Sequence, residues 1–228
     1  MMQNKRYAIV VAGGKGERMG TTVPKQFLVL AGLPILMHTL KAFHKADPKI
    51  HLVLVLPVSE ILFWKQLCVQ YDFNIKHQLI EGGPTRFASV KNGLDQITEE
   101  SIIAVHDGVR PFVSRDLIRN GFEVAAVQGT AVPSVNVSES IRMVDHGKSK
   151  ALDRSKYFLI QTPQCFSSKL LKRAYEQPFR DIYTDDASVV ETLGETVHLI
   201  AGNRMNLKIT SPEDLIIAEA CLKDISDC

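Results

Sequence analysis

The chain has little cysteine, little net charge and no long apolar stretch, and each shortage argues against a class of protein. Its four cysteines lie far apart and form no C-x-x-C pair, which argues against a zinc site and is typical of a thiol-reduced cytoplasmic protein. A net charge of +2 is too small for a general binder of nucleic acids or membrane surfaces. Neither a signal peptide nor a membrane-spanning segment is expected.

Two common nucleotide-binding motifs are also missing. The Walker pattern needs a glycine followed by Lys and then Ser or Thr, whereas Gly20 is followed by two threonines. The dinucleotide pattern G-x-G-x-x-G fits only loosely at Gly14 and Gly16, and no acidic residue stands where the second strand should end. Any nucleotide loop in this chain is therefore of a different kind.

What the chain does contain is a glycine-rich, cationic segment at residues 12–25, with the sequence A-G-G-K-G-E-R-M-G-T-T-V-P-K. It follows a short apolar run at residues 7–11 that predicts a buried strand. Glycine permits positive φ and lacks the Cβ that would block close approach, so such a loop can turn its N–H groups toward an anion. Arg18 and Lys25 add donors suited to phosphate. The segment predicts a phosphate-binding loop; the alternative is a flexible strand-to-helix connection.

Strand-like and helix-like segments alternate through the first half of the chain. Continuous apolar runs predict buried strands at residues 51–56 and 101–107, and apolar residues at helical spacing predict helices at 34–45 and 59–71. This alternation predicts an α/β fold, Rossmann-like, with a mainly parallel sheet and helices on both faces. We find no linker or repeat, so a single domain is expected over residues 1–228.

The alternation breaks after residue 133. Residues 135–144 are β-prone, D-H-G at 145–147 is a turn signal, and residues 157–160 predict another strand. Together they predict a protruding β-hairpin arm over residues 135–160. Because an isolated two-stranded arm is marginally stable in water, we expect it to pack on a second copy of the chain and form a homodimer.

Asp107 ends one of the predicted buried strands. The loops after Val11, Ile80 and Val105 should leave the same edge of the sheet, where ligands bind in such folds. A carboxylate there, beside a phosphate loop, suits Mg²⁺, which takes one or two carboxylates together with substrate phosphates. We predict that Asp107 holds Mg²⁺; the alternative is an ion pair with Arg110 that shapes the turn.

Several separated segments, in this order, resemble one known family. The glycine loop is followed by P-K-Q-F-L, and later come H-D-G-V-R-P at 106–111, Q-T-P-Q at 161–164, T-D-D-A-S at 184–188 and N-L-K-I-T-S-P-E-D at 206–214. These segments resemble the nucleotidyltransferases that activate sugars and polyols. Within that group the chain is most similar to the 2-C-methyl-D-erythritol 4-phosphate cytidylyltransferase family, and the similarity spans nearly the whole chain.

This resemblance implies a reaction of the non-mevalonate isoprenoid pathway. The phosphate oxygen of methylerythritol phosphate would attack the α-phosphorus of CTP in line, with Mg²⁺ assisting, and pyrophosphate would leave. A phosphate oxygen is already charged, so no general base is required and catalysis can depend on orientation and charge stabilisation. Two alternatives remain open: a cytidylyltransferase that uses ribitol 5-phosphate, and a non-catalytic sensor that only binds CTP.

The resemblance also implies roles for individual residues. Arg18 and Lys25 would bind the triphosphate and stabilise the transition state, and Lys208 would meet the α-phosphate. Arg154 would grip the acceptor phosphate from the partner subunit, and the other acceptor-binding residues would be Arg110, Ser140 and Asp185. The residues expected to contact the nucleotide are Ala12, Gly13, Gly14, Gly16, Gly82, Gly83 and Ser89.

The sequence departs from the family pattern at three places. Val11 and Ala12 open the glycine loop with V-A-G-G where P-A-A-G is common, a form also found in ribitol-5-phosphate cytidylyltransferases. Pro84 replaces a frequent acidic residue and has no N–H to offer to a base. Ser140 stands where a threonine is usual.

Overall fold

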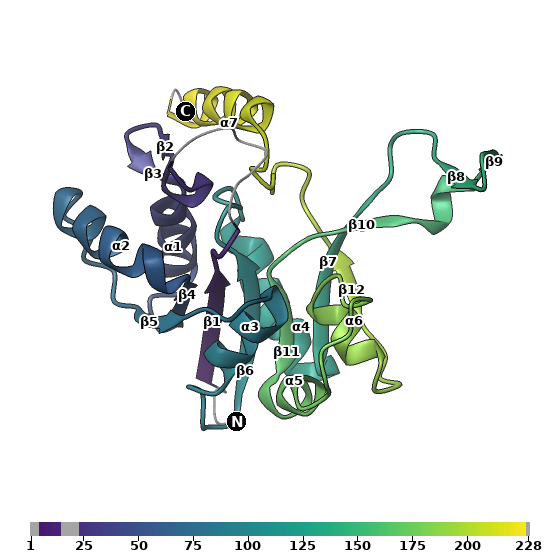
Figure 1. Ribbon diagram of the computed structural model, residues 1–228, viewed down its shortest axis with the longest axis horizontal. Helices are drawn as coiled ribbons and strands as arrows, with labels where there is room; N and C mark the ends of the chain where they lie inside the picture. The colour runs from purple at the N-terminus through teal and green to yellow at the C-terminus, as the bar shows by residue number, and fades with distance from the viewer. Residues whose placement is uncertain (1–4, 15–22, 227–228) are drawn as a thin grey trace.

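The computed structural model describes residues 5–14 and 23–226, with side chains as far as Cys221. Its central element is an eight-stranded sheet, in which the strands follow the order β10-β7-β11-β6-β1-β4-β5 and β12 pairs with β7 (Figure 1). The bounds of these strands are β1 (Lys5–Val11), β4 (His51–Leu56), β5 (Gln78–Glu81), β6 (Ser101–Asp107), β7 (Thr130–Asn136), β10 (Phe158–Ile160), β11 (Gln164–Ser167) and β12 (Leu199–Ala201).

The sheet is mostly parallel. Strands β6, β1, β4 and β5 pair in parallel, as the apolar runs in the sequence predict. Strand β11 is antiparallel to both β6 and β7, and β10 is antiparallel to β7. The predicted fold class is therefore confirmed, with an antiparallel portion on the side where the arm leaves the sheet.

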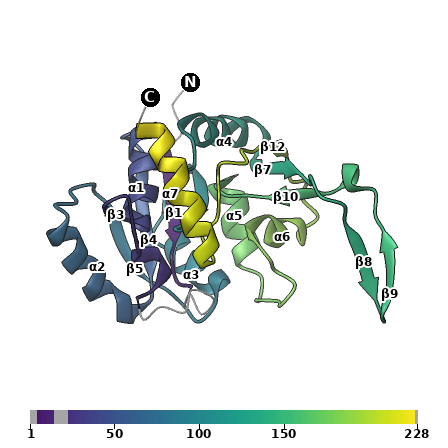
Figure 2. The same cartoon turned by 90° about the horizontal axis from the view of Figure 1, so that it is seen from above.

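Helices cover both faces of the sheet, because successive side chains of each strand point to opposite faces. On one face Val10 packs among buried residues of α1 (Ile35–Ala46), α2 (Val58–Gln70) and α4 (Arg115–Gln128). On the other face Ile9 packs with α3 (Arg86–Leu94), α5 (Ser168–Tyr175) and α6 (Asp186–Glu191). Figure 2 shows α4 and α5 on opposite sides of the sheet.

The last helix packs at the end of the molecule that carries a small β-hairpin. Helix α7 (Pro212–Ser226) contacts the small hairpin of β2 (Val29–Leu30) and β3 (Leu33–Pro34) (Figure 1). A third apolar cluster, which includes Leu30 and Ala218, joins these elements. In the described part of the chain, no helix is both long enough and apolar enough to span a membrane.

The arm differs from the sequence prediction in its extent. Residues 130–136 form β7 and residues 158–160 form β10, and both strands belong to the central sheet. Between these two strands, β8 (Arg142–Asp145) and β9 (Lys148–Ala151) form a two-stranded sheet of their own, which projects from the rest of the chain (Figure 1). His146 and Gly147 both have positive φ, as a tight hairpin turn requires.

Candidate active site

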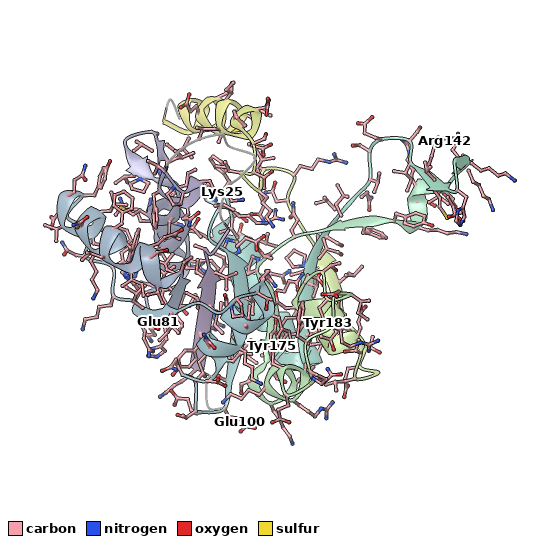
Figure 3. All side chains as sticks on the ribbon, viewed as in Figure 1. Lys25, Glu81, Glu100, Arg142, Tyr175 and Tyr183 are labelled. Atoms are coloured by element: carbon pink, nitrogen blue, oxygen red, sulfur yellow. The ribbon has the colours of Figure 1, made fainter. Side chains whose placement is uncertain are left out.

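Loops that leave one edge of the sheet enclose a pocket of about 290 Å³. They follow β1, β5 and β6, whose parallel pairing brings their carboxyl ends together, and Lys25 lies beyond the end of β1 (Figure 3). The predicted convergence of these loops is confirmed. The lining residues are Val11, Ala12, Gly13, Gly14, Lys25, Gln26, Gly83, Pro84, Thr85, Arg86, Ser89, Asp107, Val109 and Lys208.

Two glycines of the pocket allow neighbouring atoms to approach closely because they have no Cβ. A Cβ on Gly83 would lie 2.5 Å from the Cβ of Ala88, and the Cε of Lys25 lies 3.5 Å from the place of a Cβ on Gly14. Positive φ is found at none of Gly13, Gly14, Gly82 and Gly83. Of the two properties of glycine, freedom to take positive φ and absence of a Cβ, these four positions therefore use the second, which allows close approach.

Gly83→Ala is expected to lower the free energy of unfolding by about 1–3 kcal/mol, because the new methyl group would overlap Ala88 in a packed turn. Gly13→Ala is the matched control, since its nearest neighbour, Pro57, is 3.9 Å from the new Cβ. Urea denaturation of both variants measures the difference. Equal stability of the two variants would contradict the prediction.

Three cations surround the carboxylate of Asp107, which is 8 % exposed at the end of β6. Its Oδ2 lies 3.0 Å from Nζ of Lys208 and 3.2 Å from Nε of Arg110, and its Oδ1 lies 3.8 Å from Nε of Arg86. Burial alone would raise the pKa of Asp107, but the three cations outweigh burial and hold the pKa well below its usual range. The ion pair with Arg110 that the sequence left open is thus present.

A hydrogen-bond network behind the pocket fixes Asp107 and Arg110. The N–H of Asp107 donates to Oγ1 of Thr162 (3.1 Å), and Nη1 of Arg110 donates to the backbone oxygen of Asn206 (2.8 Å). Nδ2 of Asn206 donates in turn to the backbone oxygen of Thr162 (2.8 Å). Oγ1 of Thr162 also lies 3.0 Å from Nδ1 of His106. Burial lowers the pKa of His106 to about 3. The segments Q-T-P-Q and N-L-K therefore support the pocket as well as supplying Lys208.

Arg86 and Asp186 are functional candidates that the sequence analysis did not identify. Nη1 and Nη2 of Arg86 donate to the two oxygens of Asp186, at 3.0 and 2.7 Å, and Arg86 also lines the pocket. Asp186 raises the pKa of Arg86 against the opposing effect of burial. The sequence signal for Asp186 was its place in the family-like segment T-D-D-A-S, and Arg86 follows closely on Gly82 and Gly83, two predicted nucleotide contacts.

Asp185, a predicted acceptor-binding residue, is not among the residues that line the pocket. Its side chain caps α6 by accepting a hydrogen bond from the N–H of Ser188 (2.9 Å), and its Oδ2 accepts another from Nε2 of Gln164 (2.8 Å). The structure therefore shows Asp185 holding the start of α6.

Ser140 and Arg154 lie in the exposed segment around the arm, away from the pocket of their own chain. Nη1 of Arg154 donates to the backbone oxygen of Ser138. Gly16 and Arg18 lie outside the described residues. Of the other predicted residues, Ala12, Gly13, Gly14, Lys25, Gly83, Ser89, Asp107 and Lys208 meet in the pocket, Gly82 adjoins it and Arg110 contacts Asp107.

Asp107 is the one carboxylate among the described residues that line the pocket. Within residues 5–14 and 23–226, no group of three or more His, Cys, Asp or Glu side chains is placed to hold a metal ion. A protein-only metal cage is thus not found in the described part of the chain. A single carboxylate is nevertheless what Mg²⁺ needs when substrate phosphates supply the other ligands.

Comparison with known proteins decides the family. The sequence pattern of 2-C-methyl-D-erythritol 4-phosphate cytidylyltransferase matches residues 7–224. The chain belongs to this family. The predicted resemblance is therefore confirmed, and membership makes the chain an enzyme of the nucleotidyltransferase class. The alternative of a non-catalytic sensor is not supported.

Curated relatives in this family match over nearly their whole length. The 2-C-methyl-D-erythritol 4-phosphate cytidylyltransferase of Bacteroides fragilis is 50% identical over 217 residues, covering 95% of this chain and 99% of the relative. That of Porphyromonas gingivalis is 48% identical over 222 residues, covering 97% and 99%. The described fold is thus accompanied by similarity along the whole sequence.

Solved structures in the family share the fold. The 4-diphosphocytidyl-2C-methyl-D-erythritol synthase of Anaerococcus prevotii superposes with a TM-score of 0.82 at 26% identity, covering 96% of this chain and 99% of that chain. The 2-C-methyl-D-erythritol 4-phosphate cytidylyltransferase of Thermus thermophilus gives a TM-score of 0.76 at 31% identity, with the same coverage.

Proposed function

We propose that the chain transfers CMP from CTP to the phosphate of 2-C-methyl-D-erythritol 4-phosphate, with release of pyrophosphate, as a cytoplasmic step of non-mevalonate isoprenoid synthesis. The observation that carries the proposal is the pocket in which a glycine loop meets Lys25, Lys208 and Asp107 at one edge of the sheet. Family membership over residues 7–224 supports the same substrates. The relatives' names refer to this acceptor and to cytidylyl transfer.

The chemistry needs charge stabilisation more than proton transfer. An oxygen of the acceptor phosphate forms a bond to the α-phosphorus of CTP, and the bond from that phosphorus to the bridging oxygen of pyrophosphate breaks with its electron pair. Negative charge builds on the α-phosphoryl oxygens as this happens. Lys25 and Lys208 line the pocket and can approach these oxygens, and Arg18 is proposed to join them. The buried His106 is too poor a base, and too enclosed, to take part.

Mg²⁺ fits the site as an ion brought in with the triphosphate. Oδ2 of Asp107 already contacts Lys208 and Arg110, whereas Nε of Arg86 lies 3.8 Å from Oδ1, beyond hydrogen-bond length. Oδ1 therefore keeps lone pairs for a metal ligand bond. When bound, Mg²⁺ would neutralise charge on the phosphates. Asp107 is the residue proposed to hold it.

The cytidine is proposed to lie against the loops after β1 and β5. The described lining here is Ala12, Gly13 and Gly14 on one side, with Gly16 expected to extend the contact, and Gly83 and Ser89 on the other, where Gly82 adjoins the pocket. Ser89 has a fixed hydroxyl, because its Oγ accepts from the N–H of Gly83 (3.1 Å) and donates to the backbone oxygen of Thr85 (2.9 Å). Fixed polar groups of this kind discriminate between bases through hydrogen bonds that a wrong base leaves unmade.

The acceptor is proposed to bind between two chains. Arg110 lies beside the pocket, while Arg154 and Ser140 lie out on the arm and would reach the site of a second copy. Strand β10 supports a homodimer, because all three of its residues, Phe158, Leu159 and Ile160, expose apolar side chains that a second chain could cover. Asp185 would act on the acceptor only indirectly, through the position of α6.

Purified protein with Mg²⁺, CTP and methylerythritol phosphate is expected to release pyrophosphate, measured by a coupled phosphate assay. Parallel reactions omit Mg²⁺ or replace the acceptor with ribitol 5-phosphate, the candidate that the A-G-G form of the loop favours. Pyrophosphate release with ribitol 5-phosphate but not with methylerythritol phosphate would identify ribitol 5-phosphate as the acceptor. No release with either acceptor would contradict the proposed function.

A further inference from the structure

One guanidinium is shared by two carboxylates from distant parts of the chain. Arg86 opens α3 and pairs with Asp186 through both Nη atoms, at 3.0 and 2.7 Å, while its Nε lies 3.8 Å from Oδ1 of Asp107. A two-bonded arginine–carboxylate pair fixes the plane of the guanidinium as well as its position. Arg86 therefore links the start of α6 to the end of β6, at the wall of the nucleotide pocket.

The Asp186 end of this link is buried and hydrogen-bonded on both carboxylate oxygens. The side chain of Asp186 is 0 % exposed, and its Oδ1 also accepts a hydrogen bond from the hydroxyl of Tyr175 (2.6 Å). The ring of Tyr175 stacks on Phe87, the residue after Arg86, with ring centroids 4.5 Å apart and planes inclined by 20°. The position of Arg86 is thus fixed by buried neighbours that do not line the pocket.

The cations around Asp107 are not equivalent. The Lys208 side chain is 44 % exposed, and Asp107 is the one carboxylate it contacts in the described part of the chain. A bound phosphate can therefore draw Lys208 away at little cost. Arg110 and Arg86 cannot follow, because Arg110 is tied to a backbone oxygen and Arg86 to a buried carboxylate. The arginines are the groups that still hold Asp107 when Lys208 turns to the nucleotide.

We propose that Arg86, held by Asp186, is a positioning residue that keeps the Asp107 carboxylate in place for the complex of Mg²⁺ with CTP. The inference rests on the proposed function, because it takes Asp107 as the residue that meets Mg²⁺. In this proposal Arg86 and Asp186 act through Asp107 and do not contact the nucleotide. Groups that orient a metal ligand in this way commonly change metal affinity or activity by about 10–100-fold when removed.

A double-mutant cycle between Asp186 and Asp107 tests the inference. Asp186→Asn is expected to weaken CTP binding in saturating Mg²⁺ by about tenfold, measured by isothermal titration calorimetry without an acceptor. In an Asp107→Asn background the same substitution should cost less than about twofold, because the group through which it acts has lost its charge. A purely structural role, or a direct contact of Arg86 with CTP, would give the same loss in both backgrounds.

Two further variants keep the cycle interpretable. Asp47→Asn is the matched control: it breaks the half-buried Arg6–Asp47 pair (3.5 Å), which lies outside the pocket, and should leave CTP affinity unchanged. If Asp186→Asn does not fold, Arg86→Met/Asp186→Asn replaces it in both backgrounds, since it removes both charges and leaves none unpaired. The expected losses are the same.

Two results would overturn the inference: an unchanged affinity in Asp186→Asn, or equal losses in the two backgrounds. The cycle needs CTP binding but no acceptor. A wild-type chain that binds CTP with Mg²⁺ and fails to use methylerythritol phosphate would therefore refute the acceptor assignment, while the cycle would still decide the role of Arg86. A wild-type chain that does not bind CTP would overturn both.

Discussion

Lys25→Ala is expected to lower kcat by about a thousandfold, the upper range for loss of one group that stabilises transition-state charge. Lys25 opens the short 3-10 helix Lys25–Phe27 and lines the pocket, with its Cε 3.5 Å from the place that a Cβ on Gly14 would take. Charge on the α-phosphoryl oxygens grows toward the transition state, so the loss should fall mainly on kcat. KM for the acceptor should change by less than about threefold. Steady-state pyrophosphate release at varied acceptor concentration measures both quantities.

The control for this prediction is Lys65→Ala, which removes an exposed lysine from α2, outside the pocket. It should retain the wild-type kcat and melting temperature. A Lys25→Ala chain with a normal kcat would remove Lys25 from catalysis. A chain with normal kcat and a strongly raised KM for CTP would limit Lys25 to ground-state binding of the triphosphate.

Mixing two inactive chains, Arg154→Ala and Lys25→Ala, is expected to restore activity if the arm serves the partner's pocket. In a mixed dimer one site combines an intact pocket with an intact arm, and the other site carries both defects. An equal mixture at random pairing should recover about a quarter of the wild-type activity, because half of the dimers have one working site of two. The chains are mixed, unfolded and refolded together, and turnover is measured against the unmixed variants.

The matched control mixes Lys25→Ala with Lys208→Ala, two defects that lie in the same pocket. Every site in that mixture carries one of them, so activity should stay at the level of the single variants. If mixed dimers of Arg154→Ala and Lys25→Ala form and stay inactive, each arm acts on its own chain or has no part in the reaction. Subunits carrying two different affinity tags allow the mixed dimers to be isolated and counted.

The parallel half of the sheet could be predicted because its strands are continuous apolar runs. Strand β6 is buried along all seven residues, and its sequence S-I-I-A-V-H-D shows this directly. The antiparallel part was harder to see. Strand β11 has four residues, and nothing local shows that it inserts between β6 and β7, which lie earlier in the chain. Such an arrangement depends on tertiary pairing.

Some residues of the candidate site could likewise be predicted from the sequence, and others could not. Lys25 and Asp107 could be predicted from local motifs and from the rule that parallel strands end together, whereas Lys208 was implied only by the family resemblance. The pairing of Arg86 with Asp186 could not, because the two residues are 100 positions apart. For Asp185 a local signal did exist: an aspartate followed three residues later by a serine is close to the capping-box pattern, and the structure shows that box.

The arm leaves and rejoins the sheet at one place, because β7 and β10 are neighbours with Asn136 opposite Phe158. The segment between these two residues can therefore change in length or composition without altering the register of the central sheet. The loops of the nucleotide pocket follow strands on the other side of β11, so changes in the arm do not alter the pocket. If Arg154 holds the acceptor as proposed, acceptor choice and nucleotide choice are separate evolutionary modules, and a hairpin transplanted between relatives would carry one preference without disturbing the other.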